Sequence, residues 1–227
     1  MSEKTKNILL GVLIVGLVSM TVAYAALSQT LNINGSAKVQ GSTSWNVHFT
    51  PEDDSTKDAI ELINYAKLTT AGSTISLAAT QVTTPDVTLS APGDKVEFRF
   101  DVINEGKINA ELSALPTNVS AAGILTGYTV NYTTAPSGTS EEIAAANAVL
   151  TALQNDIVVK LTYADGTAIT AGDKLYNADD TDITHFKRRD LLLTIEYVQR
   201  ETNQELPTSE VTISGIASSL IYVQETN

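Results

Sequence analysis

The chain contains no cysteine, so no disulfide can stabilise it. Aromatic residues make up only 6% of its 227 residues. Basic residues are also few: 14 Lys and Arg stand against 26 Asp and Glu, which gives a formal net charge of −12 at pH 7. Such an acidic chain repels phosphate backbones and anionic membrane surfaces. We therefore expect no nucleic-acid partner, and a domain that relies on its core, on assembly or on metal.

Residues that carry catalytic chemistry are scarce as well. The two histidines, His48 and His185, lie far apart in the sequence, and no H-E-x-x-H zinc motif is present. There is no cysteine nucleophile and no G-x-S-x-G motif for a serine nucleophile. His48 falls on the polar phase of its segment, which indicates a surface residue. The sequence favours a protein that is not an enzyme, with no catalytic residues and no cofactor.

The longest hydrophobic run lies at the N-terminus. Residues 8–26 read ILLGVLIVGLVSMTVAYAA and follow two lysines, Lys4 and Lys6. A basic start, an apolar stretch and a small-x-small end predict a secretory signal peptide that is cut between Ala25 and Ala26. The run is also about as long as the roughly 20 residues that span a bilayer. Residues 1–25 are thus predicted to be a signal peptide, with a retained membrane anchor as the alternative.

A short alternating segment follows the signal peptide. Leu27, Leu31 and Ile33 share one face of an extended strand, and small polar residues occupy the other face. Fully burying such aliphatic side chains is worth roughly 1.5–3 kcal/mol each. The strand therefore pairs either within its own domain or with the sheet of a neighbouring subunit. We predict that residues 26–35 form a donor-strand arm and residues 36–227 form one domain.

The remaining chain is typical of an all-β domain, predicted to be a β-sandwich with one or two short inserted helices. The clearest strand contains Val96, Phe98, Phe100 and Val102; it is expected to be half-buried, with residues 108–115 as its return strand. Further strands are predicted near residues 45–49, 75–82, 128–132, 157–163, 191–197 and 211–223, the last broken at Gly215.

Two helices are predicted from capping patterns. A capping box over residues 139–142 opens a helix whose inward face is expected to carry Ile143, Ala146, Leu150 and Leu153. Residues 55–58 are expected to cap a second, short helix that reaches Ala66.

The turns around the clearest strand resemble those of a known family. Leu89-Ser90-Ala91-Pro92-Gly93-Asp94-Lys95 fits an L-x-x-P-G-D turn, and Asn104-Glu105-Gly106 fits an N-x-G turn. Together with the signal and the arm, these motifs resemble the camelysin and TasA family over the N-terminal region and residues 84–115. The resemblance implies a jelly-roll-like sandwich, a SipW-type signal peptidase, and secretion. It also implies polymerisation into bacterial biofilm-matrix fibres by donor-strand complementation.

Three functions follow from these features. The first is a secreted subunit of extracellular fibres, a head-to-tail homopolymer in which Leu27, Leu31 and Ile33 are the assembly residues and an accessory matrix protein is a further partner. The second is a membrane-anchored monomer at the cell surface that binds or adheres through its loops. The third is a camelysin-type metalloprotease, whose metal site would need His48, His185 and acidic side chains.

Two charged clusters are candidate binding sites. Asp173, Asp179, Asp180 and Asp182 offer the loop oxygens that calcium prefers, although their spacing does not match an EF-hand and a solvated loop is the alternative. A second acidic group, residues 52–54 with Asp58, is a weaker candidate for calcium, because helix capping already accounts for part of it. The only basic cluster, residues 187–189, either contacts an acidic patch of a neighbouring subunit or lies solvated at the start of a strand.

Overall fold

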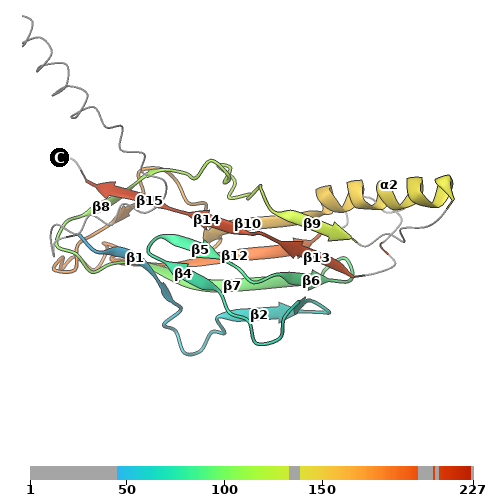
Figure 1. Ribbon diagram of the computed structural model, residues 1–227. Coiled ribbons are helices and arrows are strands. Elements are labelled where there is room, and N and C mark those ends of the chain that lie inside the picture. The colour runs from blue at the N-terminus through green and yellow to red at the C-terminus, as the bar shows by residue number, and fades with distance from the viewer. Residues whose placement is uncertain (1–44, 133–138, 199–206, 208–209, 226–227) are drawn as a thin grey trace, which may run out of the picture. The chain divides into compact units, whose positions relative to one another are not determined.

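The structure is a computed structural model that describes residues 45–132, 139–198, 207 and 210–225 (Figure 1). These residues form mostly antiparallel β-strands in four sheets, together with one helix. The prediction of an all-β domain is confirmed at this level. The signal peptide, its cleavage between Ala25 and Ala26, and the arm with Leu27, Leu31 and Ile33 all lie outside the described residues.

The largest sheet, here called the central sheet, has five strands. Four of them lie in the order β1, β7, β12 and β10, and β2 pairs with β7 on the same edge as β1. Their bounds are β1 Val47–Pro51, β2 Ile60–Ile63, β7 Lys95–Asn104, β10 Ile157–Tyr163 and β12 Arg188–Tyr197.

Three smaller sheets contain the other strands, in the orders β3-β6-β13-β9, β14-β5-β4 and β11-β8-β15. The bounds are β3 Lys67–Leu68, β4 Ser76–Ala78, β5 Gln81–Thr83, β6 Val87–Leu89, β8 Ala110–Ala114, β9 Thr129–Tyr132, β11 Lys174–Leu175, β13 Val211–Ser214, β14 Ala217–Ser219 and β15 Ile221–Gln224. The last three of these strands follow one another in the chain, and the predicted break lies between β13 and β14, where Gly215 has a φ of +72°. The predicted strand over residues 75–82 is instead the hairpin β4–β5.

The core is built from alternating residues of β7 and β12. In the register of this pair, Phe98 lies opposite Leu193 and Phe100 lies opposite Leu191, and all four side chains are fully buried. The ring of Phe49 on β1 meets Phe100 edge to face, with 5.1 Å between the ring centroids. Apolar residues of the smaller sheets join the same buried cluster. Alternation along these strands therefore identified the core correctly.

The outward face of β7 differs from the prediction of a half-buried strand. Glu97 is 8% exposed and Asp101 is 0% exposed, although both point away from the apolar phase. The Glu97 carboxylate forms ion pairs with Lys95 at 2.8 Å and with Arg99 at 2.5 Å. The loop of residues 52–59 is bonded to β7, since the Arg99 amide donates to the Ala59 carbonyl at 2.9 Å. The expectation failed because charged side chains on this face pair with each other and with the loop.

The predicted helix from residues 55–58 to Ala66 is wrong. Asp54 caps only a turn, because its Oδ1 accepts from the Thr56 amide at 3.0 Å and the Thr56 hydroxyl at 2.6 Å. The residues that follow form strand β2, which pairs with β7 through Ile60 opposite Phe98. Pairing with the free stretch of the β7 edge satisfies the backbone of these residues and overrides the local capping signal.

The predicted return strand after β7 is also placed differently. Strand β8 does not pair with β7; it pairs with β11 on one side and with β15 on the other. Asn104 starts this departure, because its side-chain amide donates to the carbonyls of Ile108 at 2.9 Å and Leu175 at 3.1 Å. The N-x-G turn therefore carries the chain out of the central sheet.

The helix α2, Ser140–Asp156, begins at the predicted capping box. The Thr139 amide donates to the Glu142 carboxylate at 2.7 Å, and the Glu142 amide donates back to the Thr139 hydroxyl at 3.4 Å. Its buried residues are Val149, Leu153 and Asp156, whereas Ile143 is 46% exposed. The inward face was thus predicted correctly only for the C-terminal half. No helix in the described part of the chain is both long and apolar enough to cross a membrane.

Candidate functional site

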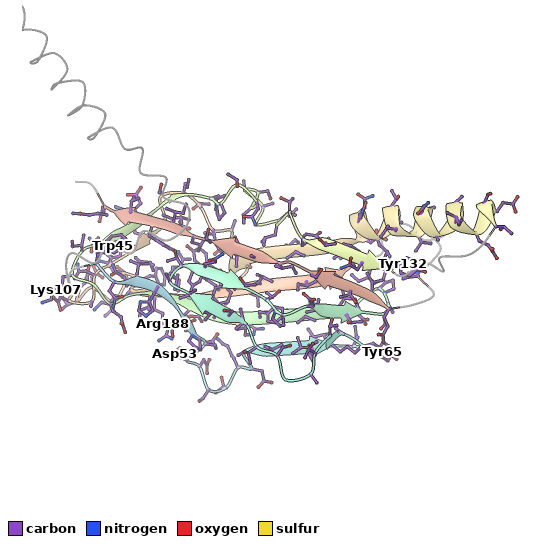
Figure 2. All side chains as sticks on the ribbon, viewed as in Figure 1. Trp45, Asp53, Tyr65, Lys107, Tyr132 and Arg188 are labelled. Atoms are coloured by element: carbon purple, nitrogen blue, oxygen red, sulfur yellow. The ribbon has the colours of Figure 1, made fainter. Side chains whose placement is uncertain are left out.

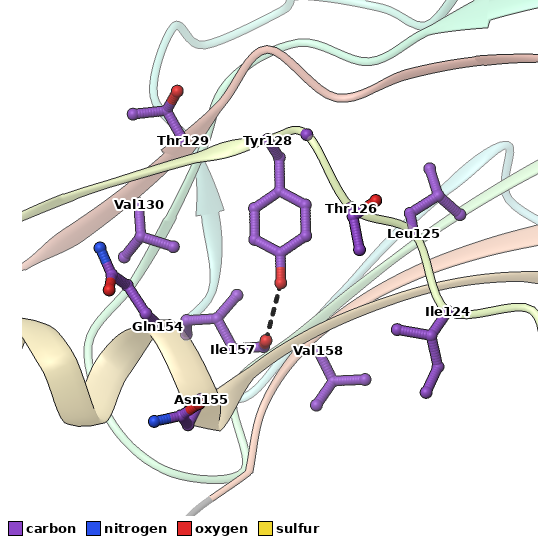
Figure 3. A pocket seen from close by; sticks show the side chains of 11 residues that line it. Ile124, Leu125, Thr126, Tyr128, Thr129, Val130, Gln154, Asn155, Ile157 and Val158 are labelled. Carbon is purple, nitrogen blue, oxygen red and sulfur yellow. Dashed lines mark hydrogen bonds between the residues drawn. The ribbon is translucent and has the colours of Figure 1, made fainter. Parts of the chain in front are cut away.

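A groove lies where the edge of β9 approaches the junction of α2 and β10 (Figure 3). Its volume is 480 Å³. It is lined by Ile124, Leu125, Thr126, Gly127, Tyr128, Thr129, Val130, Gln154, Asn155, Ile157 and Val158. We call this feature the β9–β10 groove. None of these side chains is a carboxylate, an imidazole or an amine; the polar ones are the hydroxyls of Thr126, Tyr128 and Thr129 and the amides of Gln154 and Asn155.

One wall of the groove is an open sheet edge. Strand β9 is the terminal strand of its sheet and pairs only with β13 among the described strands. In an antiparallel pair, alternate residues direct their N–H and C=O groups away from the partner strand. Part of the β9 backbone therefore faces the groove, as an edge that another extended chain can pair with.

The opposite wall is the start of β10, whose later part is covered. The Leu125 amide donates to the Val159 carbonyl at 2.8 Å, and the Leu161 amide donates to the Gly123 carbonyl at 2.8 Å. Towards the groove this pairing stops, and the Tyr128 hydroxyl donates instead to the Ile157 carbonyl at 2.9 Å, as the dashed line in Figure 3 shows. The groove thus begins where backbone pairing along β10 ends.

Gly123 allows the covering segment to approach β10 this closely. Its φ is +75°, and a Cβ at this position would lie 2.5 Å from the Leu161 carbonyl oxygen. Only glycine fits both the left-handed conformation and this contact. The sequence offered no motif for the groove. Of the adjacent apolar residues Ile124 and Leu125 before β9, Ile124 is 39% exposed and Leu125 is buried.

The two histidines occupy separate carboxylate-rich surroundings. His48 Nε2 lies 3.9 Å from Glu105, and its Nδ1 is buried without a hydrogen-bond partner. The His185 ring stacks on Tyr176 and contacts Asp180 through Nδ1 at 2.9 Å. The Asp182 amide and the His185 ring hold the pKa of Asp180 below its usual range.

The four aspartates predicted to bind calcium serve mainly local turns. Asp173 accepts from the Tyr163 hydroxyl and the Thr170 amide, both at 2.8 Å. Asp180 and Asp182 accept from amides two residues ahead, and Asp179 pairs with Lys107 at 3.8 Å. The structure does not bring these four side chains together as a group of metal-ligand atoms.

One other set of acidic side chains does converge. In the described part of the chain, Glu52, Asp101 and Asp190 form the one group of three potential ligands whose atoms lie within 4.8 Å of one another. The group contains no histidine. Sequence reasoning missed it because Asp101 and Asp190 lie on different strands, each in the outward phase of an apolar segment.

The basic cluster predicted at residues 187–189 contacts its own chain. Lys187 Nζ donates to the Ala178 carbonyl at 2.8 Å, and Arg188 Nε donates to Asp101 at 2.8 Å. The Arg189 guanidinium lies 3.4 Å from the centre of the Tyr163 ring. These contacts are a hydrogen bond, an ion pair and a cation–π interaction within the domain, so the cluster is not simply solvated. The predicted contact with a neighbouring subunit stays a prediction.

Comparison with known proteins gives no match: no family model, no curated protein and no solved structure corresponds to this chain. The resemblance of its turn motifs to the camelysin and TasA family therefore stays a prediction.

Proposed function

We propose that this protein is an exported structural subunit that polymerises head to tail, with residues 27–33 of one copy bound in the β9–β10 groove of the next. The observation that supports this proposal most directly is the position of β9 as the terminal strand of its sheet among the described strands, beside a groove that is lined in part by apolar residues. An alternating segment such as residues 27–33 has the two features that the groove requires, a free strand backbone and one apolar face.

The size of the groove fits this occupant. A cavity of roughly 150 Å³ accepts a benzene molecule, and the groove measures 480 Å³. It therefore has room for more than one aliphatic side chain. Leu27, Leu31 and Ile33 would together gain on the order of 5–9 kcal/mol from full burial, to which backbone hydrogen bonds along β9 would add.

The proposed contact joins two different segments of the chain. Such a heterologous contact does not close on itself unless the rotation between copies closes a ring, so it produces open filaments. In the full proposal, a SipW-type peptidase removes residues 1–25, Ala26 becomes the first residue of the arm, and the subunits form extracellular matrix fibres. The finer description of the fold as a jelly-roll-like sandwich belongs to the same proposal.

Electron microscopy of two purified chains tests the proposal. Residues 26–227 should form fibres, and residues 36–227 should remain single particles. If both chains give only single particles, the proposal that the arm is sufficient for assembly fails. That outcome would favour an anchored binding module.

A matched pair of arm variants tests the strand geometry. Leu31→Asp places a charge on the apolar face and should stop fibre growth while the subunit stays folded. Thr30→Asp adds the same charge one residue earlier, on the opposite face, and should leave fibres of normal length. Equal effects of the two variants would contradict an alternating strand.

A further inference from the structure

A second site is suggested by the outer face of the central sheet, where β7 and β12 carry acidic residues at the same level. In the strand register, Asp101 on β7 lies opposite Asp190 on β12 and opposite Thr50 on β1. Glu52 follows directly after the end of β1. One oxygen of each carboxylate lies within 4.8 Å of the others. Figure 2 labels two neighbours of this group, Asp53 and Arg188.

Asp101 is the buried member of the group. Its side chain has 0% exposure, whereas that of Asp190 is 41% exposed. Arg188 bonds to Asp101 Oδ2 at 2.5 Å and to Asp53 of the loop of residues 52–59 at 2.5 Å, and Glu52 of the same loop has an oxygen within 4.8 Å of the other two carboxylates. The site is therefore anchored in the sheet and linked to a loop that contributes its own ligand.

Two carboxylate oxygens of the group are buried and have no hydrogen-bond partner. Arg188 occupies Oδ2 of Asp101, and Oδ1 of the same carboxylate is unpartnered. The Asp54 amide donates to Oε1 of Glu52 at 3.1 Å, and Oε2 of Glu52 is unpartnered. An unpaired, buried carboxylate oxygen is costly. The free oxygen of a fully buried aspartate points to a positive partner that the protein itself does not supply.

The charge around the group also favours such a partner. The surrounding charged side chains are five carboxylates, Glu52, Asp53, Asp54, Asp101 and Asp190, and two cations, Lys57 and Arg188. Lys57 is already bonded to Asp190 at 3.2 Å and lies 3.5 Å from Asp54. Five negative charges against two positive charges leave a local excess of three negative charges.

We propose that Glu52, Asp101 and Asp190 bind a hard divalent cation, with Ca²⁺ as the preferred ion. Calcium takes oxygen ligands at 2.3–2.6 Å, so two oxygens on one ion are at most about 5 Å apart, a limit that this group meets. An all-oxygen site with no histidine favours Ca²⁺ or Mg²⁺ over zinc. Six to eight ligands are usual for calcium, so water and further oxygens would complete the site.

Bound calcium would join the loop of residues 52–59 to the two longest strands of the central sheet. The unpartnered oxygens of Asp101 and Glu52 would both become ligands, while Arg188 and the Asp54 amide keep the other oxygens oriented. This role is independent of strand donation, because it concerns the folding of one subunit.

Calorimetric titration of the full chain with CaCl₂, after removal of metal with a chelator, tests the inference. We expect one Ca²⁺ per chain, and a higher unfolding temperature in CaCl₂ than in NaCl of equal ionic strength. Asp101→Asn should weaken the affinity at least about tenfold. Because Asp101 is buried, Glu52→Gln serves as a second variant at a less buried position, and we expect a similar loss.

Asp58→Asn is the matched control, since it removes one charge from an exposed position of the same loop. Its affinity for calcium should stay within about twofold of the unmodified chain, because screening by salt weakens distant charges. Absence of any calcium-dependent heat and of any shift in the unfolding temperature would overturn the proposal. Equal losses for Asp58→Asn and Asp101→Asn would overturn it as well, since they would indicate nonspecific attraction.

Discussion

At the scale of single residues, Asp101 depends on neighbours that are far away in the sequence. Alternation places it correctly in the outward phase of β7, and on that basis it was expected to be exposed. It is instead fully buried, with Asp190 opposite it in the strand register and Glu52 of the loop that follows β1 close to its carboxylate. The pattern of one strand cannot report the register of another, so this environment could not be predicted.

The buried position of Asp101 makes the stability of the protein depend on pH. Burial, followed by repulsion from Glu52 and Asp190, raises the pKa of Asp101 from 3.8 to about 6, although Arg188 opposes the shift. The folded state therefore holds this proton more tightly than the unfolded state does. The associated stability is fully present below about pH 4 and is lost as the pH rises through about 6.

Asp101→Asn should remove this dependence. In the presence of a chelator, the free energy of unfolding of the unmodified chain should fall relative to that of the variant between pH 4 and pH 7. The expected relative change is on the order of 3 kcal/mol, from about two pKa units. Urea unfolding at several pH values measures this difference. A difference that stays constant over this range would show that Asp101 does not titrate there.

At the scale of elements, local patterns identified strands better than they identified pairing. Strands β7, β10 and β12 were predicted because each carries four apolar residues in strict alternation. The partner of β8 was not, because hydrogen bonds of Asn104 direct the chain to another sheet. The helix predicted after Ser55 does not form, for a related reason. A turn at Asp54 gives the same capping signal, and the residues that follow pair with the edge of β7 as strand β2.

The segment that covers β10 provides a test of element geometry. Gly123 and Gly127 both have positive φ, at +75° and +87°, but only Gly123 lacks space for a Cβ. Gly127→Ala should cost about 1 kcal/mol, the usual penalty of a left-handed alanine. Gly123→Ala should cost roughly 2–4 kcal/mol, since contact with the Leu161 carbonyl also displaces the segment.

Denaturant unfolding of the two glycine variants compares these costs. The difference between them isolates the contact of Gly123 with β10, because the conformational penalty is common to both. If the two variants lose equal stability, the segment is not held against β10 as the structure shows. The groove would then not be bounded by the segment that pairs with β10 through Gly123 and Leu125.

At the scale of the whole molecule, the acidic charge limits how copies can associate. With a formal net charge of −12, subunits repel one another at long range. Growth of the proposed filament would therefore need a contact of short range and large apolar area, which an inserted strand would supply. The sequence indicated a donor segment but gave no acceptor, because an open edge exists only once the strands of a sheet have been ordered.

Strands β9 and β15 are two candidate acceptors among the described terminal strands, each with an exposed aliphatic residue on it or close to it. Strand β9 faces the groove, where Ile124 is 39% exposed, and β15 is terminal in its own sheet, where Val223 is 44% exposed. The two residues have similar exposure, so a charge at either should cost the isolated subunit a similar, small amount of stability. Only the residue at the true acceptor should affect assembly.

Ile124→Asp should reduce fibre formation by residues 26–227 at least about tenfold. The reason is that the incoming arm would desolvate a carboxylate in the groove, and each 1.4 kcal/mol of lost binding free energy lowers the affinity tenfold. Val223→Asp should form fibres like the unmodified chain. Fibre mass by sedimentation measures both variants, and circular dichroism checks that both stay folded. If Val223→Asp stops growth and Ile124→Asp does not, the acceptor is β15, and the arm adds to the edge beside β8 rather than to the groove.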